Sequence, residues 1–284
     1  MSRCKPPVAV GGIGGSGTRL VAQMLSASGY FLGADLNEAS DNLWFTLLFK
    51  RPDILACTDR EYADLCEIFV KGMVGGGEFI GAEREIVQRL AATGRDQHDA
   101  KWLQERADTL LSHHMPRDAD ERWGWKEPNT HVVLDRLIRA FRGMQYIFVS
   151  RHGLDMAVSS NQNQPQLWGP TFLGEPFAAT PRYSLRYWCF MHRRVMAIGE
   201  EMGERFLFLK YDDLCRDQSP ELARLCRFVG VSEPIVPQRL LNLVTPPTTI
   251  GRYMSHRRDE FDEDDIAYVE SLGFAVDAFD CRRT

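Results

Sequence analysis

Five glycines near the start of the chain lie where a phosphate-binding loop would be expected. The apolar run Val8–Val10 is followed by Gly12-Ile-Gly-Gly-Ser-Gly-Thr-Arg19, and apolar residues then recur at helical spacing between positions 20 and 25. A glycine loop between a buried strand and a helix points backbone N–H groups at an anion, and the helix dipole adds a favourable potential. The segment therefore predicts a strand, an anion-binding loop and a helix.

Two common nucleotide-binding loops fit this segment only in part. Gly12 and Gly17 have Walker A spacing, but Thr18-Arg19 stands where Lys-Ser/Thr is required, so hydrolysis of ATP or GTP is not expected. The same glycines match the dinucleotide pattern G-x-G-x-x-G, with Asp35 near the right distance for a ribose contact. The second strand of that fold has only Tyr30-Phe-Leu32 to form it. An NAD(P)-binding Rossmann-type oxidoreductase remains an alternative.

The amino-acid composition excludes several classes of protein. The 284 residues are 44% hydrophobic and 26% charged, with a formal net charge of −5, which is typical of a globular chain. The acidic balance argues against a nucleic-acid partner. The seven cysteines have no C-x-x-C spacing, so neither a disulfide framework nor a metal site is expected. Because no signal peptide and no apolar run of about 18 residues is present, we expect a cytoplasmic protein without a membrane partner.

Further strands and helices alternate along the rest of the chain. Apolar runs predict strands at Arg122–Lys126, Gln145–Ser150 and Arg205–Leu209. Helical spacing of apolar residues follows at 132–141 and 221–229, and an acid-rich last helix is predicted at 261–272. Strands separated by helices indicate a parallel α/β sheet.

Two stretches stand apart from this alternation. Residues 38–115 have a helical pattern, broken only at Gly75-Gly-Gly77, and form a predicted helical insert. The stretch Asn163–Pro181 is rich in proline and glycine, which indicates a long functional loop that could act as a lid. We therefore expect residues 1–284 to form a single domain with a helical insert.

The second half of the chain resembles a known family of enzymes. The segment Tyr146-Ile-Phe-Val-Ser-Arg-His-Gly-Leu-Asp-Met-Ala-Val-Ser-Ser160 resembles the 3′-phosphate segment of sulfotransferases that use 3′-phosphoadenosine 5′-phosphosulfate (PAPS). Arg151 would end a buried strand, where α/β sheets bind ligands, and Ser159 would lie about two turns along the next helix. A guanidinium group can bind a phosphate through two hydrogen bonds. Gly15-Ser-Gly-Thr-Arg-Leu20 resembles the 5′-phosphosulfate loop of the same family.

Three other segments agree with this resemblance. Gly124-Trp-Lys-Glu-Pro-Asn129 resembles the lysine motif of the tyrosylprotein branch, in which Lys126 would stand beside the bridging oxygen of the leaving group. Leu209-Lys-Tyr-Asp-Asp-Leu214 resembles the stretch after the fourth core strand. Thr248-Thr-Ile-Gly-Arg252 resembles the segment that closes over the adenosine and its 3′ phosphate.

The resemblance implies an α/β fold with a P-loop-NTPase-like parallel sheet flanked by helices. It implies transfer of a sulfuryl group from PAPS to a hydroxyl or amine, with adenosine 3′,5′-bisphosphate as product and no metal. The acceptor would be a small molecule, carbohydrate or peptide bound through the 38–115 insert. A non-catalytic module that binds the nucleotide bisphosphate is the other alternative. The residues implied for nucleotide binding are Gly15, Ser16, Gly17, Thr18, Arg19, Arg151, Ser159, Tyr211, Thr249 and Arg252.

Catalysis by such a chain needs cations and one base. Lys126 and Arg19 are the candidates for stabilising negative charge in the transition state. Glu38 is the first candidate for the base, because the carboxylate-using branch of the family keeps its base in this region. Asp41 and His131 are the alternatives. The acids near residue 40 could instead cap the helix that begins at Leu43.

Overall fold

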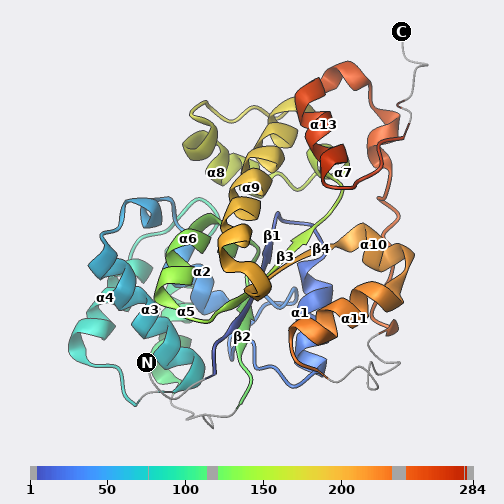
Figure 1. Ribbon diagram of the computed structural model, residues 1–284. Helices are drawn as coiled ribbons and strands as arrows, with labels where there is room; N and C mark the ends of the chain where they lie inside the picture. The colour runs from blue at the N-terminus through green and yellow to red at the C-terminus, as the bar shows by residue number, and fades with distance from the viewer. Residues whose placement is uncertain (1–4, 76, 114–120, 232–240, 278, 280–284) are drawn as a thin grey trace. The chain divides into compact units, whose positions relative to one another are not determined.

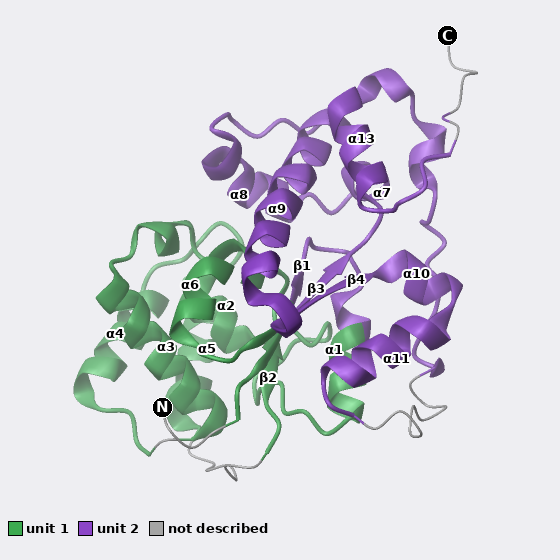
Figure 2. Ribbon diagram, viewed as in Figure 1, with its two compact units in different colours: residues 1–10, 21–145 green, residues 11–20, 146–284 purple. Residues whose placement is uncertain are grey.

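The computed structural model describes residues 5–75, 77–113, 121–231, 241–277 and 279. Cys4 and Cys281 lie outside these residues, and the other five cysteines form no disulfide. The chain divides into two compact units, one of residues 1–10 with 21–145 and one of residues 11–20 with 146–284 (Figure 2). The prediction of a single domain stays a prediction.

The strands confirm the predicted α/β class. They are β1 (Val8–Gly12), β2 (Gly124–Lys126), β3 (Gln145–Ser150) and β4 (Phe206–Lys210), in the order β2-β1-β3-β4. In the first unit β1 and β2 are parallel, with Val10 opposite Lys126, and in the second β3 and β4 are parallel, with Ser150 opposite Lys210. The strands are short, largely buried and flanked by helices, as is typical of parallel sheets (Figure 1).

The insert in the first unit is helical, as predicted. It contains α2 (Leu43–Phe49), α3 (Asp59–Val74), α4 (Gly81–Ala91) and α5 (Ala100–Ser112), and α6 (Leu134–Ala140) follows β2. The helix α2 contacts α3, α4 and α5 and is buried along its whole length (Figure 1). Its Phe45 stacks on Trp125 of β2 with ring centroids 5.8 Å apart, and Phe69 of α3 meets Trp125 edge-on at 5.3 Å. Aromatic packing thus fixes the start of the insert against β2.

At both ends of helix α2, side chains form hydrogen bonds with backbone groups. At its start, Asn42 accepts a hydrogen bond from the Phe45 N–H at 2.8 Å, and its own N–H donates to the Lys126 carbonyl at 2.7 Å. At its end, the Arg95 guanidinium donates to the carbonyls of Thr46, Leu47 and Lys50 at 2.8–3.3 Å. The carbonyls of a last helical turn have no partner within the helix, so Arg95 supplies one.

The second unit is arranged around a helix that the sequence analysis did not predict. Helix α9 (Pro181–Met202) contacts β4, α7 (Gly153–Ala157), α8 (Asn163–Leu173) and α13 (Glu263–Ser271). Thr180 caps it by accepting from the Tyr183 N–H. Two further helices, α10 (Tyr211–Arg216) and α11 (Gln218–Phe228), contact β4. Helix α1 (Thr18–Ala27) follows the glycine loop.

The prediction of a long loop at Asn163–Pro181 is wrong. Most of this stretch forms α8, and α9 begins at its last residue. Pro165 lies in the first turn of α8, where the missing N–H has no helical partner to lose, and Pro170 is accommodated inside the helix. Gly174 ends α8 in the left-handed conformation, with φ +71°. Only residues 174–180 connect the two helices, so no long lid is present here.

None of the helices in the described ranges is long and apolar enough to cross a membrane. The expected cytoplasmic location stays a prediction.

Removing the Arg95 side chain tests how the insert is held. We expect Arg95→Ala to lower the free energy of unfolding by about 2–3 kcal/mol, because several carbonyls at the end of α2 lose a charged donor. The matched control is Arg139→Ala, whose side chain is 70% exposed and, among the residues that the structure describes, pairs with Asp135 alone; we expect a change within about 0.5 kcal/mol. Urea unfolding of the two variants decides, and equal midpoints would contradict the role given to Arg95.

Candidate functional site

The glycine loop of the second unit has the geometry of an anion-binding loop. Gly15 and Gly17 both adopt φ +92°, a conformation that favours glycine, and the Ser16 N–H donates to the Ile13 carbonyl at 3.0 Å. Helix α1 begins at Thr18, directly after this turn. The Ser16 hydroxyl is buried and has no hydrogen-bond partner among the described residues. A buried hydroxyl at a helix N-terminus therefore stands where an anion would bind.

Tyr211 packs directly on this loop. A Cβ atom placed on Gly17 would come within 2.1 Å of the Tyr211 ring, so only glycine fits beneath that ring. The Tyr211 hydroxyl donates to the Thr245 carbonyl at 3.4 Å. Burial raises the pKa of Tyr211 to about 12, and the neighbouring Cys215 contributes. The phenol is therefore neutral at ordinary pH and serves as a wall of the loop.

Arg151 follows β3 and is buried, with 6% of its surface exposed. Its Nη2 donates to the Thr249 hydroxyl at 2.8 Å. Its Nε has no partner among the described residues, although it is buried. A buried guanidinium with an unused donor is costly unless an acceptor binds it, so Arg151 is a candidate for contact with an anionic ligand.

Asp155 of α7 fixes the segment that carries Arg252. Its carboxylate, on a side chain only 1% exposed, accepts from the N–H groups of Gly251 at 2.8 Å and Tyr253 at 3.2 Å. Its backbone carbonyl accepts from the Arg252 Nε at 2.6 Å. The sequence analysis missed Asp155. The signal was an acid inside an otherwise apolar run, between Leu154 and Met156.

Arg151 and Arg252 lie close enough for their charges to repel each other. Burial lowers the pKa of the Arg252 guanidinium, and the positive charge of Arg151 lowers it further. Both groups are nevertheless anchored, Arg151 on Thr249 and Arg252 on Asp155. Two anchored cations side by side favour a ligand with more than one negative charge.

His152 supports the same corner of the second unit. Its N–H donates to the buried Asp212 carboxylate at 3.0 Å, and its ring stacks on Tyr253 with centroids 4.8 Å apart. Burial raises the pKa of Asp212, and the His152 N–H opposes that shift. His152 is a second residue that the sequence analysis missed, and it positions the backbone next to Arg151.

Ser159 does not lie on a helix as predicted. Helix α7 ends at Ala157, and Ser159 follows it, with its N–H donating to the Met156 carbonyl and its hydroxyl accepting from the Asn161 N–H at 3.2 Å. An early end of α7 turns the chain before a second helical turn forms. The part of Ser159 in binding phosphate stays a prediction.

In the first unit, Lys126 ends β2 and is almost completely buried, with 2% of its side chain exposed. Its ammonium forms an ion pair with Asp41 and donates to the Ala39 carbonyl at 3.0 Å. Asp41 is 20% exposed. The lysine of the predicted catalytic set and the second candidate base are therefore direct partners.

The other predicted catalytic residues are placed differently. Glu38 is exposed in the loop before α2, and Arg19 is exposed on the first turn of α1. His131 is fully buried, with its Nδ1 hydrogen-bonded to the Pro128 carbonyl at 2.7 Å. Beside Lys126, Glu127 is buried and accepts from the Asn129 side chain at 2.8 Å. Burial raises the pKa of Glu127, and the Asp41 charge raises it further.

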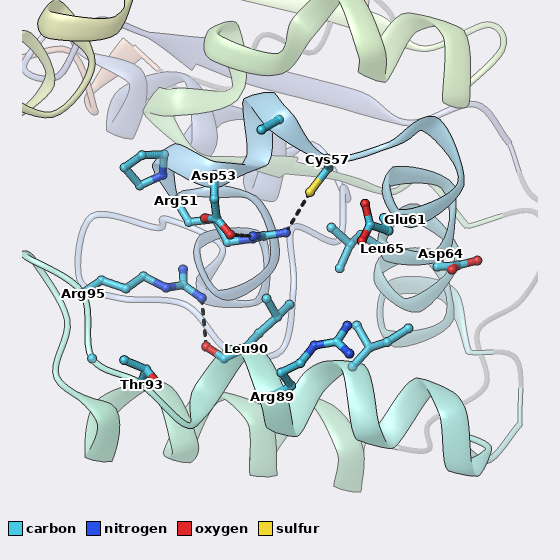
Figure 3. A pocket seen from close by; sticks show the side chains of 14 residues that line it. Arg51, Asp53, Cys57, Glu61, Asp64, Leu65, Arg89, Leu90, Thr93 and Arg95 are labelled. Atoms are coloured by element: carbon cyan, nitrogen blue, oxygen red, sulfur yellow. Dashed lines mark hydrogen bonds and ion pairs between the residues drawn. The ribbon is translucent and has the colours of Figure 1, made fainter.

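A separate cavity of about 660 Å³ lies within the insert (Figure 3). Its charged lining residues are Arg51, Asp53, Glu61, Asp64, Arg89 and Arg95. Arg51 is already engaged by Asp53 and by the Cys57 sulfur, and Arg95 by backbone carbonyls such as that of Leu90 (Figure 3). The cavity lies beyond the C-terminal end of α2, whereas Lys126 contacts the loop before its start.

The sequence matches the profile of the sulfotransferase family over residues 6–234. The chain belongs to the sulfotransferase family. Among solved structures, the sulfotransferase domain of the Synechococcus olefin synthase is 19% identical, with 98% of each chain covered and a TM-score of 0.54. A sulfotransferase from Mycobacterium avium is 17% identical, with 96% of this chain and 78% of that chain covered and a TM-score of 0.51. A search of curated proteins found no match.

This family membership confirms the sulfotransferase interpretation of the chain, while the binding role of the glycine loop stays a prediction. The structure also removes what the dinucleotide alternative needed. Asp35 pairs with Arg106 at 3.0 Å and accepts from the Thr109 hydroxyl at 2.5 Å, so its carboxylate is engaged by α5. The apolar residues 30–32 form no named strand, and only Phe31 makes an isolated bridge, to Trp123.

A matched pair of glycine substitutions tests the loop of this sulfotransferase. We expect Gly17→Ala to lower the free energy of unfolding by about 2 kcal/mol or more, because φ +92° disfavours alanine and its Cβ would overlap the Tyr211 ring. Gly14→Ala is the control, since its Cβ would meet nothing closer than 3.5 Å, and its cost is about 1 kcal/mol or less. Thermal unfolding compares them. Equal melting temperatures would contradict the packing of Tyr211 on the loop.

Proposed function

We propose that this sulfotransferase moves a sulfuryl group from PAPS to a hydroxyl or amine acceptor by in-line displacement. The other product is adenosine 3′,5′-bisphosphate. The observation that carries the proposal is the pair of guanidinium groups of Arg151 and Arg252, anchored on Thr249 and on the Asp155 carbonyl, with the buried Arg151 Nε left without a described partner. The 3′ phosphate of this donor has the charge and the number of oxygens that such a pair can bind.

The residues of the second unit fit both phosphate groups of the donor. The backbone N–H groups of Gly15–Thr18 and the unpartnered Ser16 hydroxyl would hold the 5′ phosphosulfate at the start of α1. Arg151, with its unused Nε, and Arg252 would hold the 3′ phosphate. Thr249, already bonded to Arg151, and Ser159 would add hydroxyl donors, and Tyr211 would support the loop.

The transfer step needs charge stabilisation and one proton acceptor. The acceptor oxygen or nitrogen forms a bond to sulfur while the bond from sulfur to the bridging phosphate oxygen breaks, and the acceptor proton leaves to a base. Lys126 would stabilise the negative charge that develops on the departing oxygen, and Arg19 would face the sulfuryl oxygens. Glu38 is exposed and forms no ion pair with the residues that the structure describes, so it remains available as the base.

The acceptor site is proposed to come from the insert at 38–115. This stretch includes the loop that contacts Lys126 and the helices that follow it. A small molecule, a carbohydrate or a peptide with a free hydroxyl is the class of acceptor that this chemistry serves.

Calorimetry without magnesium tests the donor directly. We expect adenosine 3′,5′-bisphosphate to bind, and transfer of labelled sulfate from PAPS to appear in a panel of alcohols, phenols, sugars and peptides. Binding of NAD in place of the bisphosphate would overturn the proposal. Binding of the bisphosphate with no transfer to any member of the panel would favour a non-catalytic binding module.

Substitution of Arg151 separates donor binding from general damage. We expect Arg151→Ala to weaken binding of adenosine 3′,5′-bisphosphate by about 30-fold or more, because a charge-assisted contact worth about 2 kcal/mol is lost. Arg216→Ala is the control in the same unit, since its side chain is 75% exposed. Isothermal calorimetry gives both affinities, and an unchanged affinity of Arg151→Ala would contradict the assigned 3′-phosphate site.

Lys126→Ala tests the transfer step. We expect turnover to fall by at least about 100-fold while the affinity for the bisphosphate changes little, because Lys126 is assigned to charge that develops only in the transition state. Steady-state rates and calorimetry on the same preparation measure the two effects. Equal losses in turnover and affinity would show that Lys126 instead binds the donor in its ground state.

A further inference from the structure

The loop before α2 is built around the side chain of Asn37. Its Oδ1 accepts from two backbone N–H groups, those of Ala39 at 2.9 Å and Asp41 at 2.8 Å. Because two donors point at this atom, it must be the oxygen, and the Nδ2 group is fixed on the other side. That Nδ2 donates to the Asp41 Oδ2 at 2.9 Å. The Asn37 side chain thus stabilises the loop through its oxygen and positions the Asp41 carboxylate through its nitrogen.

The backbone between these contacts adopts an unusual conformation. Ser40 has φ +61°, the only positive φ at a residue other than glycine in the described parts of the chain. This conformation is unfavourable for an L-residue and persists only where surrounding contacts enforce it. The Ser40 N–H donates to the Asn37 carbonyl at 2.9 Å. The turn directs the Ala39 carbonyl and the Asp41 carboxylate toward the same ammonium.

That ammonium belongs to Lys126. An ammonium has three donors, and Ala39 and Asp41 take two of them. The described residues supply no partner for the third. Because the side chain is only 2% exposed, its direction is set by the loop and not by solvent.

We propose that Asn37 is a positioning residue for Lys126. It acts through Asp41, and fixes the ammonium so that the third donor is presented to the oxygen that leaves the sulfuryl group. The inference rests on the proposed function for the meaning of that third donor. In this arrangement Asp41 positions Lys126: one of its carboxylate oxygens contacts the Lys126 ammonium, and the other accepts a hydrogen bond from Asn37. Two charged groups lie near Asp41: Lys126, which ends β2, and the buried Glu127, which follows it in the next turn.

The variant Asn37→Asp separates the two functions of this side chain. The new carboxylate keeps an oxygen for the N–H groups of Ala39 and Asp41, so the turn is retained. It loses the donor to Asp41 and places two carboxylates side by side. We expect turnover, with the best acceptor of the panel above, to fall by about tenfold near neutral pH, while the affinity for adenosine 3′,5′-bisphosphate stays unchanged.

The pH dependence of turnover then distinguishes the positioning of Lys126 by Asn37 from a purely structural role of Asn37 in the loop. Two adjacent carboxylates share a proton as the pH falls, and that proton restores a donor to Asp41. We expect the ratio of variant to wild-type turnover to rise as the pH is lowered from about 8 to about 5.5. If Asp41 were instead the base, the shared proton would lower the ratio further. Gln88→Glu, an exposed amide-to-acid change on α4, is the control and should show a constant ratio.

A second measurement needs no acceptor. The chain has six lysines, so the ammonium signals of a protein labelled with ¹⁵N-lysine can be resolved, and Lys126→Arg assigns the signal of Lys126. A buried, hydrogen-bonded ammonium exchanges slowly with water, so we expect this signal in the wild type and its loss or displacement in Asn37→Ala and Asn37→Asp. Melting temperatures confirm that the variants fold.

The two possible failures are distinguishable. An unchanged Lys126 signal in both Asn37 variants, or wild-type turnover and pH profile in Asn37→Asp, would overturn the positioning of Lys126 by Asn37. Wild-type turnover in Lys126→Ala would instead overturn the proposed function of Lys126, whatever its signal shows.

Discussion

The Asp155 carboxylate joins two segments of the second unit that are far apart in the sequence. It accepts the N–H groups of Gly251 and Tyr253, and the carbonyl of the same residue accepts Arg252. Arg151 and Arg252, which are proposed to bind the nucleotide, are positioned by segments that this contact joins. Without these bonds the turn at Gly251 has no anchor on α7, and the repulsion between Arg151 and Arg252 would move the guanidinium groups apart.

Holding two cations together is unfavourable until an anion binds. Burial already lowers the pKa of Arg252, and Arg151 adds to that effect. The fold supplies compensation at other atoms, through the Thr249 hydroxyl and the Asp155 carbonyl, and leaves the Arg151 Nε without a described acceptor. The unpartnered Arg151 Nε therefore lowers the stability of the fold at an atom to which a phosphate could bind, as is common at binding sites.

Local patterns in the sequence were sufficient for the strands and the glycine loop, because a short apolar run next to glycines has few other structures to adopt. These local patterns gave wrong or incomplete predictions where contacts between distant residues determine the structure. Proline and glycine content indicated a loop at Asn163–Pro181, but packing against α9 stabilises α8 there. Lys126 could be selected from its motif, whereas its partner Asp41 could not be fixed, because the bond depends on the left-handed turn at Ser40. Asp155 has no motif of its own, and only the fold reveals what it binds.

The net charge of −5 is compatible with an anionic ligand because of where the acids point. Asp212 lies near Arg151 and Asp155 lies near Arg252, yet both carboxylates accept bonds from backbone N–H groups. These carboxylates take no hydrogen bond from Arg151 among the described residues; its Nη2 donates to Thr249, and its Nε has no described acceptor. The same logic separates the two kinds of cation in this chain. In the proposed site, the arginine guanidinium groups bind a whole phosphate, and the single ammonium of Lys126, held by a loop, contacts one oxygen.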